Sequence, residues 1–216
     1  MQIWTLTTLP KDAPKEPLKI TIPTAVRDAL INGDLSTADT LLTQEISTDT
    51  NNHNSYANRS LVMARKNDWD HALDDAIKSV TIQPSLMGYI FKGIALCGKG
   101  YVRDARIAFD LAFMFTNKDL KTIHFLLLVK AIALFNSDQH EEAMLFVQQL
   151  AAACPNDDTL ACHVVETYFN IQLGITALND AHHDEAVGHF TAATCSSALS
   201  SAGAIDSMYK DFVVAS

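Results

Sequence analysis

Glycine and proline are scarce in this chain of 216 residues, with eight and six copies respectively. Most of the prolines precede Thr24, so the rest of the chain has few residues that break helices or form the turns of a sheet. Apolar residues make up 48% of the sequence and charged residues 19%, which is ordinary for a globular protein with a buried core. The composition therefore favours a helical globular protein.

Positive charge is also lacking, since the formal net charge is -9. A negative field repels phosphate backbones and no Lys/Arg cluster interrupts it, so we expect no nucleic-acid ligand. The longest apolar run, residues 123–135, contains Lys130 and falls short of the roughly 20 residues that cross a bilayer. The N-terminus lacks the regions of a signal peptide. We therefore predict no membrane partner and a cytoplasmic location, with the nucleus left open.

Closely spaced metal ligands are missing as well. The four cysteines show no C-x-x-C spacing and do not form a disulfide framework, so we expect them to be reduced and mostly buried. A zinc site would have to use Cys154, Cys162, His163, His182 and His183. Their spacing matches none of the compact zinc-ligand patterns, and we expect no metal.

A pattern of small and aromatic residues is present in residues 54–84 and recurs along the chain. Counted from His53, positions 4, 8, 20, 24, 27 and 32 hold Tyr56, Ser60, Ala72, Ala76, Ser79 and Pro84. This pattern resembles the tetratricopeptide repeat (TPR), a pair of antiparallel helices that packs through small residues at positions 8 and 20.

The same register returns in later segments, where positions 8, 20 and 24 again carry small or bulky apolar residues. Counted from Leu86 it gives Tyr89, Gly93, Gly100, Ala105, Phe109 and Ala112; from His124, Ala131, Ala143 and Pro155; from Thr167, Gly174, Ala186, Phe190 and Ala193. A weaker copy counted from Lys19 gives Gly33, Ala38 and Leu42. The later starts are further apart, which predicts a lengthened first helix from about residue 158 to 178.

The resemblance implies an all-α fold, an α/α superhelical solenoid of antiparallel helix pairs. We expect an extended arm and linker at 1–18, a repeat domain at 19–200 and a capping helix at 201–216. The repeats would span 19–52 in degenerate form, then 53–85, 86–119, 124–157 and 167–200. Ile205, Met208, Tyr209, Phe212 and Val213 have the spacing of an amphipathic helix, and we expect a longer protein to continue after it.

The resemblance also implies a concave groove, which the first helices line through positions 2, 5, 9, 12 and 13. The residues at these positions are apolar and predict binding of a hydrophobic or amphipathic peptide or helix of another protein. They include Leu61, Met87, Ile90, Ile94, Phe125, Leu128, Ile132, Phe135, Tyr168, Ile171 and Ile175, with Cys97 and Leu178 at further lining positions.

Two alternatives remain open for these side chains. They could belong to the core, because apolar helical stripes are more often core than binding site. The groove could also be filled by the chain's own N-terminal arm, where Ile3 and Leu6 flank Trp4, or by a second copy in a homodimer.

Chaperone C-terminal tails are not expected as partners. Members of the repeat family that bind such tails use a clamp of lysine, arginine and asparagine side chains. The corresponding positions hold Pro23, Arg27, Asn58, Met87 and Phe91, and only Asn58 fits.

Catalysis is not expected either. His140 with Glu142 and His183 with Glu185 look like acid/base pairs, but all four fall at positions 17 and 19, where the repeat explains them as packing residues. No phosphate-binding or nucleophile motif is present, so we predict a non-enzyme without a cofactor.

Two local expectations concern helix starts. Ser36 with Asp39 has the spacing of a capping box. Asp68, Asp70, Asp74 and Asp75 lie at the start of a helix, where acidic residues favour the helix dipole, and we expect all four on its solvated face.

Overall fold

The computed structural model describes residues 22–153 and 159–195, which form ten α-helices. The expected N-terminal arm and C-terminal capping helix lie outside the described residues. The helices are α1 (Thr24–Ile31), α2 (Leu35–Thr48), α3 (His53–Arg65), α4 (Trp69–Ile82), α5 (Leu86–Gly98), α6 (Val102–Phe113), α7 (Leu120–Phe135), α8 (His140–Ala153), α9 (Thr159–Asn179) and α10 (His183–Cys195).

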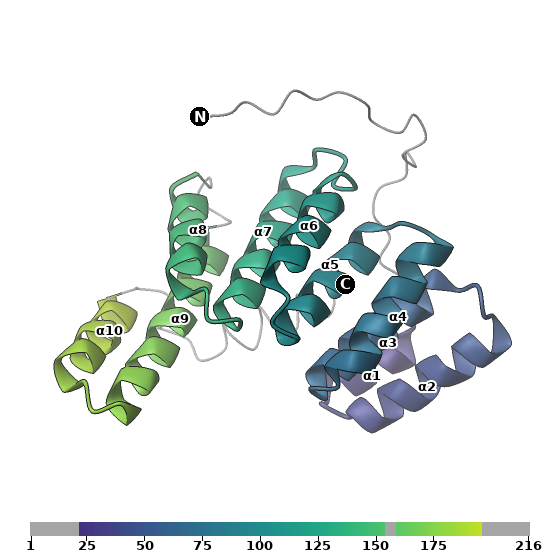
Figure 1. The fold of residues 1–216 in the computed structure, drawn as a ribbon, viewed down its shortest axis with the longest axis horizontal. Helices are drawn as coiled ribbons and strands as arrows, with labels where there is room; N and C mark the ends of the chain where they lie inside the picture. The colour runs from purple at the N-terminus through teal and green to yellow at the C-terminus, as the bar shows by residue number, and fades with distance from the viewer. Residues whose placement is uncertain (1–21, 154–158, 196–216) are drawn as a thin grey trace.

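Consecutive helices pack as antiparallel pairs, and the pairs follow one another in a row from α1–α2 at one end to α9–α10 at the other (Figure 1). The predicted all-α, TPR-like arrangement of helix pairs is confirmed. The first helix of the last pair, α9, has 21 residues, which confirms the predicted lengthening.

One turn geometry joins the two helices of every pair. Each turn has a single key residue with positive φ at repeat position 15, and the next residue's N–H donates to a carbonyl five residues back, at 2.8–3.0 Å. This is the hydrogen bond that ends a helix with a left-handed residue. The residues at this position are Gly33, Asn67, Gly100, Asp138 and Ala181. All five pairs therefore share one register.

Small residues at position 8 leave room for the residue at position 24 of the same pair. A Cβ added to Gly93 would lie 2.7 Å from the ring of Phe109, and one added to Gly174 would lie 2.7 Å from the ring of Phe190. In the second pair the small residue is Ser60, whose buried hydroxyl donates to the carbonyl of Ala72 at 2.7 Å. The helices of each pair approach closely because these positions are small.

The expected capping box at Ser36 is wrong. The residue that caps α2 is Asp34, whose carboxylate accepts from the N–H of Thr37 at 3.0 Å. The turn at Gly33 ends α1 and places Asp34 directly before α2, so the helix begins one residue too early for Ser36 to cap it.

The expectation for the acidic run holds only in part. Asp68 caps α4, and Asp70 and Asp74 are exposed, but Asp75 is 7% exposed. Its carboxylate accepts two hydrogen bonds from Arg59 of α3, at 2.7 and 2.8 Å. Placing Asp75 on the solvated face was therefore wrong, since this charge lies between the two helices of the pair, where Arg59 neutralises it.

Candidate functional site

Four of the predicted lining residues lie in the interior of the protein. Leu61, Met87 and Ile90 belong to a core cluster built from α3, α5 and α7, and each is at most 7% exposed. Phe135 lies in a second cluster, built from α7, α8 and α9. These four side chains contribute packing between neighbouring first helices and offer little surface to a partner.

The next group of lining residues is partly buried. Ile94 and Phe125 pack against the first core cluster, and Leu128 and Ile132 pack against the second. Ile171 is also half-buried. The row of apolar positions thus changes from core to surface on going from α3 toward α9.

Only on α9 do the predicted lining residues reach solvent. Tyr168, Ile175 and the neighbouring lining residue Leu178 are 38%, 43% and 51% exposed. With Ile171 they follow one another at intervals of three and four residues, which places them along one side of the helix. These four residues are called the α9 stripe below.

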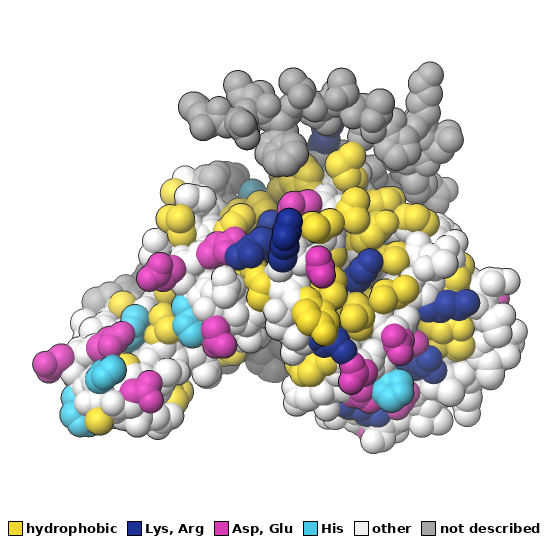
Figure 2. Space-filling model, viewed as in Figure 1, with side chains coloured by type: hydrophobic (Ala, Val, Ile, Leu, Met, Phe, Trp, Pro, Cys, Tyr) yellow, Lys and Arg dark blue, Asp and Glu magenta, His cyan; other side chains and the backbone are white. Residues whose placement is uncertain are grey.

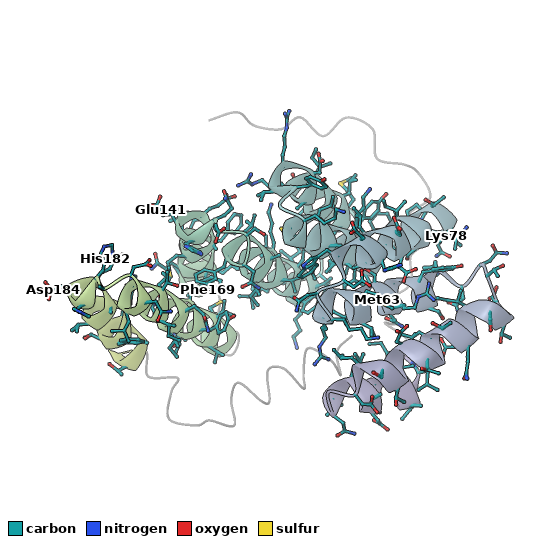
Figure 3. The ribbon with its side chains drawn as sticks, turned by 60° about the horizontal axis from the view of Figure 1, so that its bottom comes forward. Met63, Lys78, Glu141, Phe169, His182 and Asp184 are labelled. Carbon is teal, nitrogen blue, oxygen red and sulfur yellow. The ribbon has the colours of Figure 1, made fainter. Side chains whose placement is uncertain are left out.

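Aromatic stacking fixes the position of α9. The ring of Phe169 lies on that of Phe135 in α7, with centroids 4.0 Å apart and planes 4° from parallel. Tyr168 also meets Phe135, at 6.3 Å, so one end of the stripe touches the core. Figure 3 shows Phe169 at the junction between the last helix pair and the rest of the molecule. The α9 stripe therefore projects from a rigid part of the fold.

The surroundings of the stripe are uncharged along α9 itself. Residues 167–179 contain no Asp, Glu, Lys, Arg or His. The exposed polar residues on this stretch are Thr176 and Asn179, and the hydroxyl of Thr176 donates to the Gln172 carbonyl of its own helix. An apolar side chain that lands here displaces water without having to desolvate a charge of α9.

A second apolar surface was missed by the sequence reasoning. It comprises Tyr101, Ile107, Leu111, Phe113 and Met114, on α6 and the residues flanking it, with each side chain 41–54% exposed. Figure 2 shows hydrophobic side chains gathered over α6 and the adjacent α4 and α5. The repeat pattern assigns no role to these outer positions, so only their hydrophobicity could have signalled them.

Charges interrupt this α6 outer surface, unlike the α9 stripe. Arg103, Asp104 and Asp110 are exposed on the same helix, and Asp110 pairs with Lys130 of α7 at 3.2 Å. A partner helix that covered the α6 outer surface would have to satisfy these charges as well as bury apolar area.

The histidine–glutamate pairs do not form acid/base sites. The ring of His140 packs on Phe135 with centroids 4.6 Å apart, while Glu142 is bound by Arg106 of α6. The hydrogen bond to Glu142 and its charge raise the pKa of the Arg106 guanidinium.

The second pair lies at the outer end of α9–α10, where Figure 3 places His182 and Asp184. Glu185 is within 4.0 Å of His182 and His189, and all three are on the surface of the last pair. Within residues 22–153 and 159–195, no three His, Cys, Asp or Glu side chains are grouped to hold a metal. Over the same residues, no helix combines the length and hydrophobicity needed to span a bilayer.

Comparison with known proteins supports the fold. No protein-family model and no curated protein matches the sequence. Among solved structures the chain is similar to a double mutant of MamA, a TPR protein designated MamA RS-1 ArsTM. The match has a TM-score of 0.50 and 16% identity, and it covers 80% of this chain and 90% of that one. At this identity the likeness shows the fold alone, a TPR-like stack of helix pairs.

Proposed function

We propose that this protein is a non-catalytic interaction scaffold whose α9 stripe receives a hydrophobic or amphipathic helix of another protein. The observation that carries the proposal is the exposure of Tyr168, Ile175 and Leu178 on a helix segment without charges. TPR-like folds present the first helices of their pairs to partners, and α9 is the first helix of the last pair. A contiguous apolar surface of this kind is typical of an interface.

The energetics of the stripe fit a helix-binding surface. Burying a fully exposed Leu or Ile side chain stabilises a complex by about 1.5–3 kcal/mol, so three half-exposed side chains supply about 3 kcal/mol together. Partner residues that pack on Gln172 and Thr176 add to this contact. Because the stripe is uncharged, affinity should change little when the salt concentration is raised.

The proposal is tested by a pull-down with a matched pair of variants. Ile175→Asp places a charge in the stripe, whereas Thr176→Asp places the same charge one residue further, about 100° around the helix. Both positions are exposed, so neither variant buries a charge in the folded protein. The two baits and the wild-type bait are incubated with lysate of the source cells, and captured proteins are quantified by mass spectrometry.

We expect a set of proteins that wild type and Thr176→Asp capture equally and Ile175→Asp captures at least about tenfold less. A tenfold loss corresponds to about 1.4 kcal/mol, which is the order of the burial that Ile175 supplies. Circular dichroism of both variants checks that the helix content is unchanged. Equal capture by the two variants would remove the α9 stripe as the binding site.

A further inference from the structure

The α9 stripe lies close to the point where the described part of the chain ends. Helix α10 runs antiparallel to α9 and ends at Cys195, after which 21 residues of sequence follow, 196–216. The 13 residues of α10 span about 20 Å. The end of α10 is therefore about 20 Å from the turn that follows Leu178, and nearer to Tyr168.

The chain that follows is long enough to return to the stripe. Residues 196–204 can cover up to about 30 Å when extended. The stripe itself, from Tyr168 to Leu178, covers about 15 Å of helix. Residue 205 can therefore reach either end of the stripe without any movement of α9 or α10.

The sequence that begins at residue 205 has the chemistry that the stripe lacks. Its apolar residues, Ile205, Met208, Tyr209, Phe212 and Val213, recur at the spacing of one helical face. The charged residues between them, Asp206, Lys210 and Asp211, fall outside that face. Because residues 167–179 of α9 carry no charge, no like charge of α9 opposes their approach.

We propose that residues 205–213 of the chain occupy the α9 stripe in the absence of a partner, and that a partner helix must displace them. The inference rests on the proposed function, because both ligands use the same surface. Occupation by the chain's own segment lowers the apparent affinity for the partner by the fraction of molecules in which the stripe is covered. Capture of the partner is then controlled by whatever releases this segment.

Photo-crosslinking in the full chain tests the contact directly. The photoreactive residue p-benzoylphenylalanine replaces Tyr209 in one sample and Ser207, which the spacing places on the opposite face, in the other. After irradiation at low protein concentration, crosslinked peptides are mapped by mass spectrometry. We expect the probe at 209 to attach to residues 167–179 of the same molecule, and the probe at 207 to attach there at least about fivefold less.

Variants of the stripe supply the second readout. Ile175→Asp should reduce the crosslink from position 209 at least about fivefold, whereas Thr176→Asp should leave it within about twofold. Attachment of the 209 probe to α6, to a second copy or to no site overturns the proposal. Equal attachment from 207 and 209 overturns it too, because the contact would not depend on the apolar face.

The pull-down separates this inference from the proposed function. If the 209 probe marks α9 but Ile175→Asp still captures every protein, the self-contact stands and the binding function fails. If Ile175→Asp loses capture while the probe marks another element, the binding function stands and the self-contact is refuted. Where both hold, Tyr209→Asp in the full chain should increase the amount of the same proteins captured by at least about twofold.

Discussion

Alanine substitution at Gly174 and at Gly188 compares one chemical change at two positions of the last helix pair. Gly174 is at repeat position 8 of α9, and a Cβ added there would lie 2.7–2.9 Å from three atoms of the Phe190 ring. Gly188 is in the middle of α10, and a Cβ added there would meet nothing within 4 Å. Only the first substitution forces the two helices of the pair apart.

The expected free energies differ in sign. In a helix, alanine is favoured over glycine by about 1 kcal/mol, and this gain applies at both positions. Inserting a methyl group into a packed contact costs about 1–3 kcal/mol, and this cost applies at Gly174 alone. We therefore expect Gly174→Ala to destabilise the fold by about 1 kcal/mol and Gly188→Ala to stabilise it by about 1 kcal/mol.

Thermal unfolding followed by circular dichroism measures this difference. For a domain of this size, 1 kcal/mol shifts Tm by about 2–4 °C, so the two variants should differ by about 4–8 °C. Replacing Phe190 by leucine together with Gly174→Ala should restore part of the loss, since the smaller side chain makes room for the methyl group. Equal shifts for Gly174→Ala and Gly188→Ala would refute the close contact between positions 8 and 24.

Three further predictions follow from other contacts. Arg59→Met leaves Asp75 buried without its partner and should destabilise the protein by about 3 kcal/mol in urea unfolding, whereas Arg59→Met with Asp75→Leu should recover most of this loss. Ala181→Gly should raise Tm by about 2–4 °C, because Ala181 has φ +61° in a conformation that costs other L-residues about 1 kcal/mol or more. The hydrogen bond from Asp68 raises the pKa of His71, so its NMR titration should lie above the usual value of about 6.5 and fall in Asp68→Asn. The stability from this pair is present below about pH 6.5 and is lost as the pH rises through the raised pKa.

The helix pairs were predictable because their packing depends on residues at fixed spacing. Gly93 and Gly174 are glycines where the repeat needs a small residue, and Phe109 and Phe190 are large where the space must be filled. Each pair closes through a turn of the same length, so the sequence carries the geometry locally. The likeness to a solved TPR structure at 16% identity fits this view, since few positions have to be kept.

The exposure of the predicted site could not be derived in the same way. Ile90 and Ile175 both occupy position 5 or 9 of a first helix, yet Ile90 is fully buried and Ile175 is 43% exposed. The difference arises because α5 lies between other first helices, whereas α9 has such a neighbour only on the α7 side among the described residues. Burial at these positions is set by packing between pairs, which a single repeat does not encode.

The burial of Asp75 escaped prediction for a related reason. Four aspartates close together read as a solvated helix start, and the sequence does not show that Arg59, 16 residues earlier, reaches the last of them. The cap of α2 at Asp34 was missed because the turn before it has to be known to the residue.

The central claim is that a partner binds on the α9 stripe, and methyl NMR of isoleucine residues tests it most directly. In a protein of 23.7 kDa, the δ1 methyl signals of Ile175 and Ile171 report on the stripe, that of Ile107 on the α6 outer surface and that of Ile90 on the core. Adding the protein that wild type captures and Ile175→Asp loses should shift the Ile175 and Ile171 signals while those of Ile107 and Ile90 stay in place. A shift of Ile107 with no change at Ile175 would contradict the account.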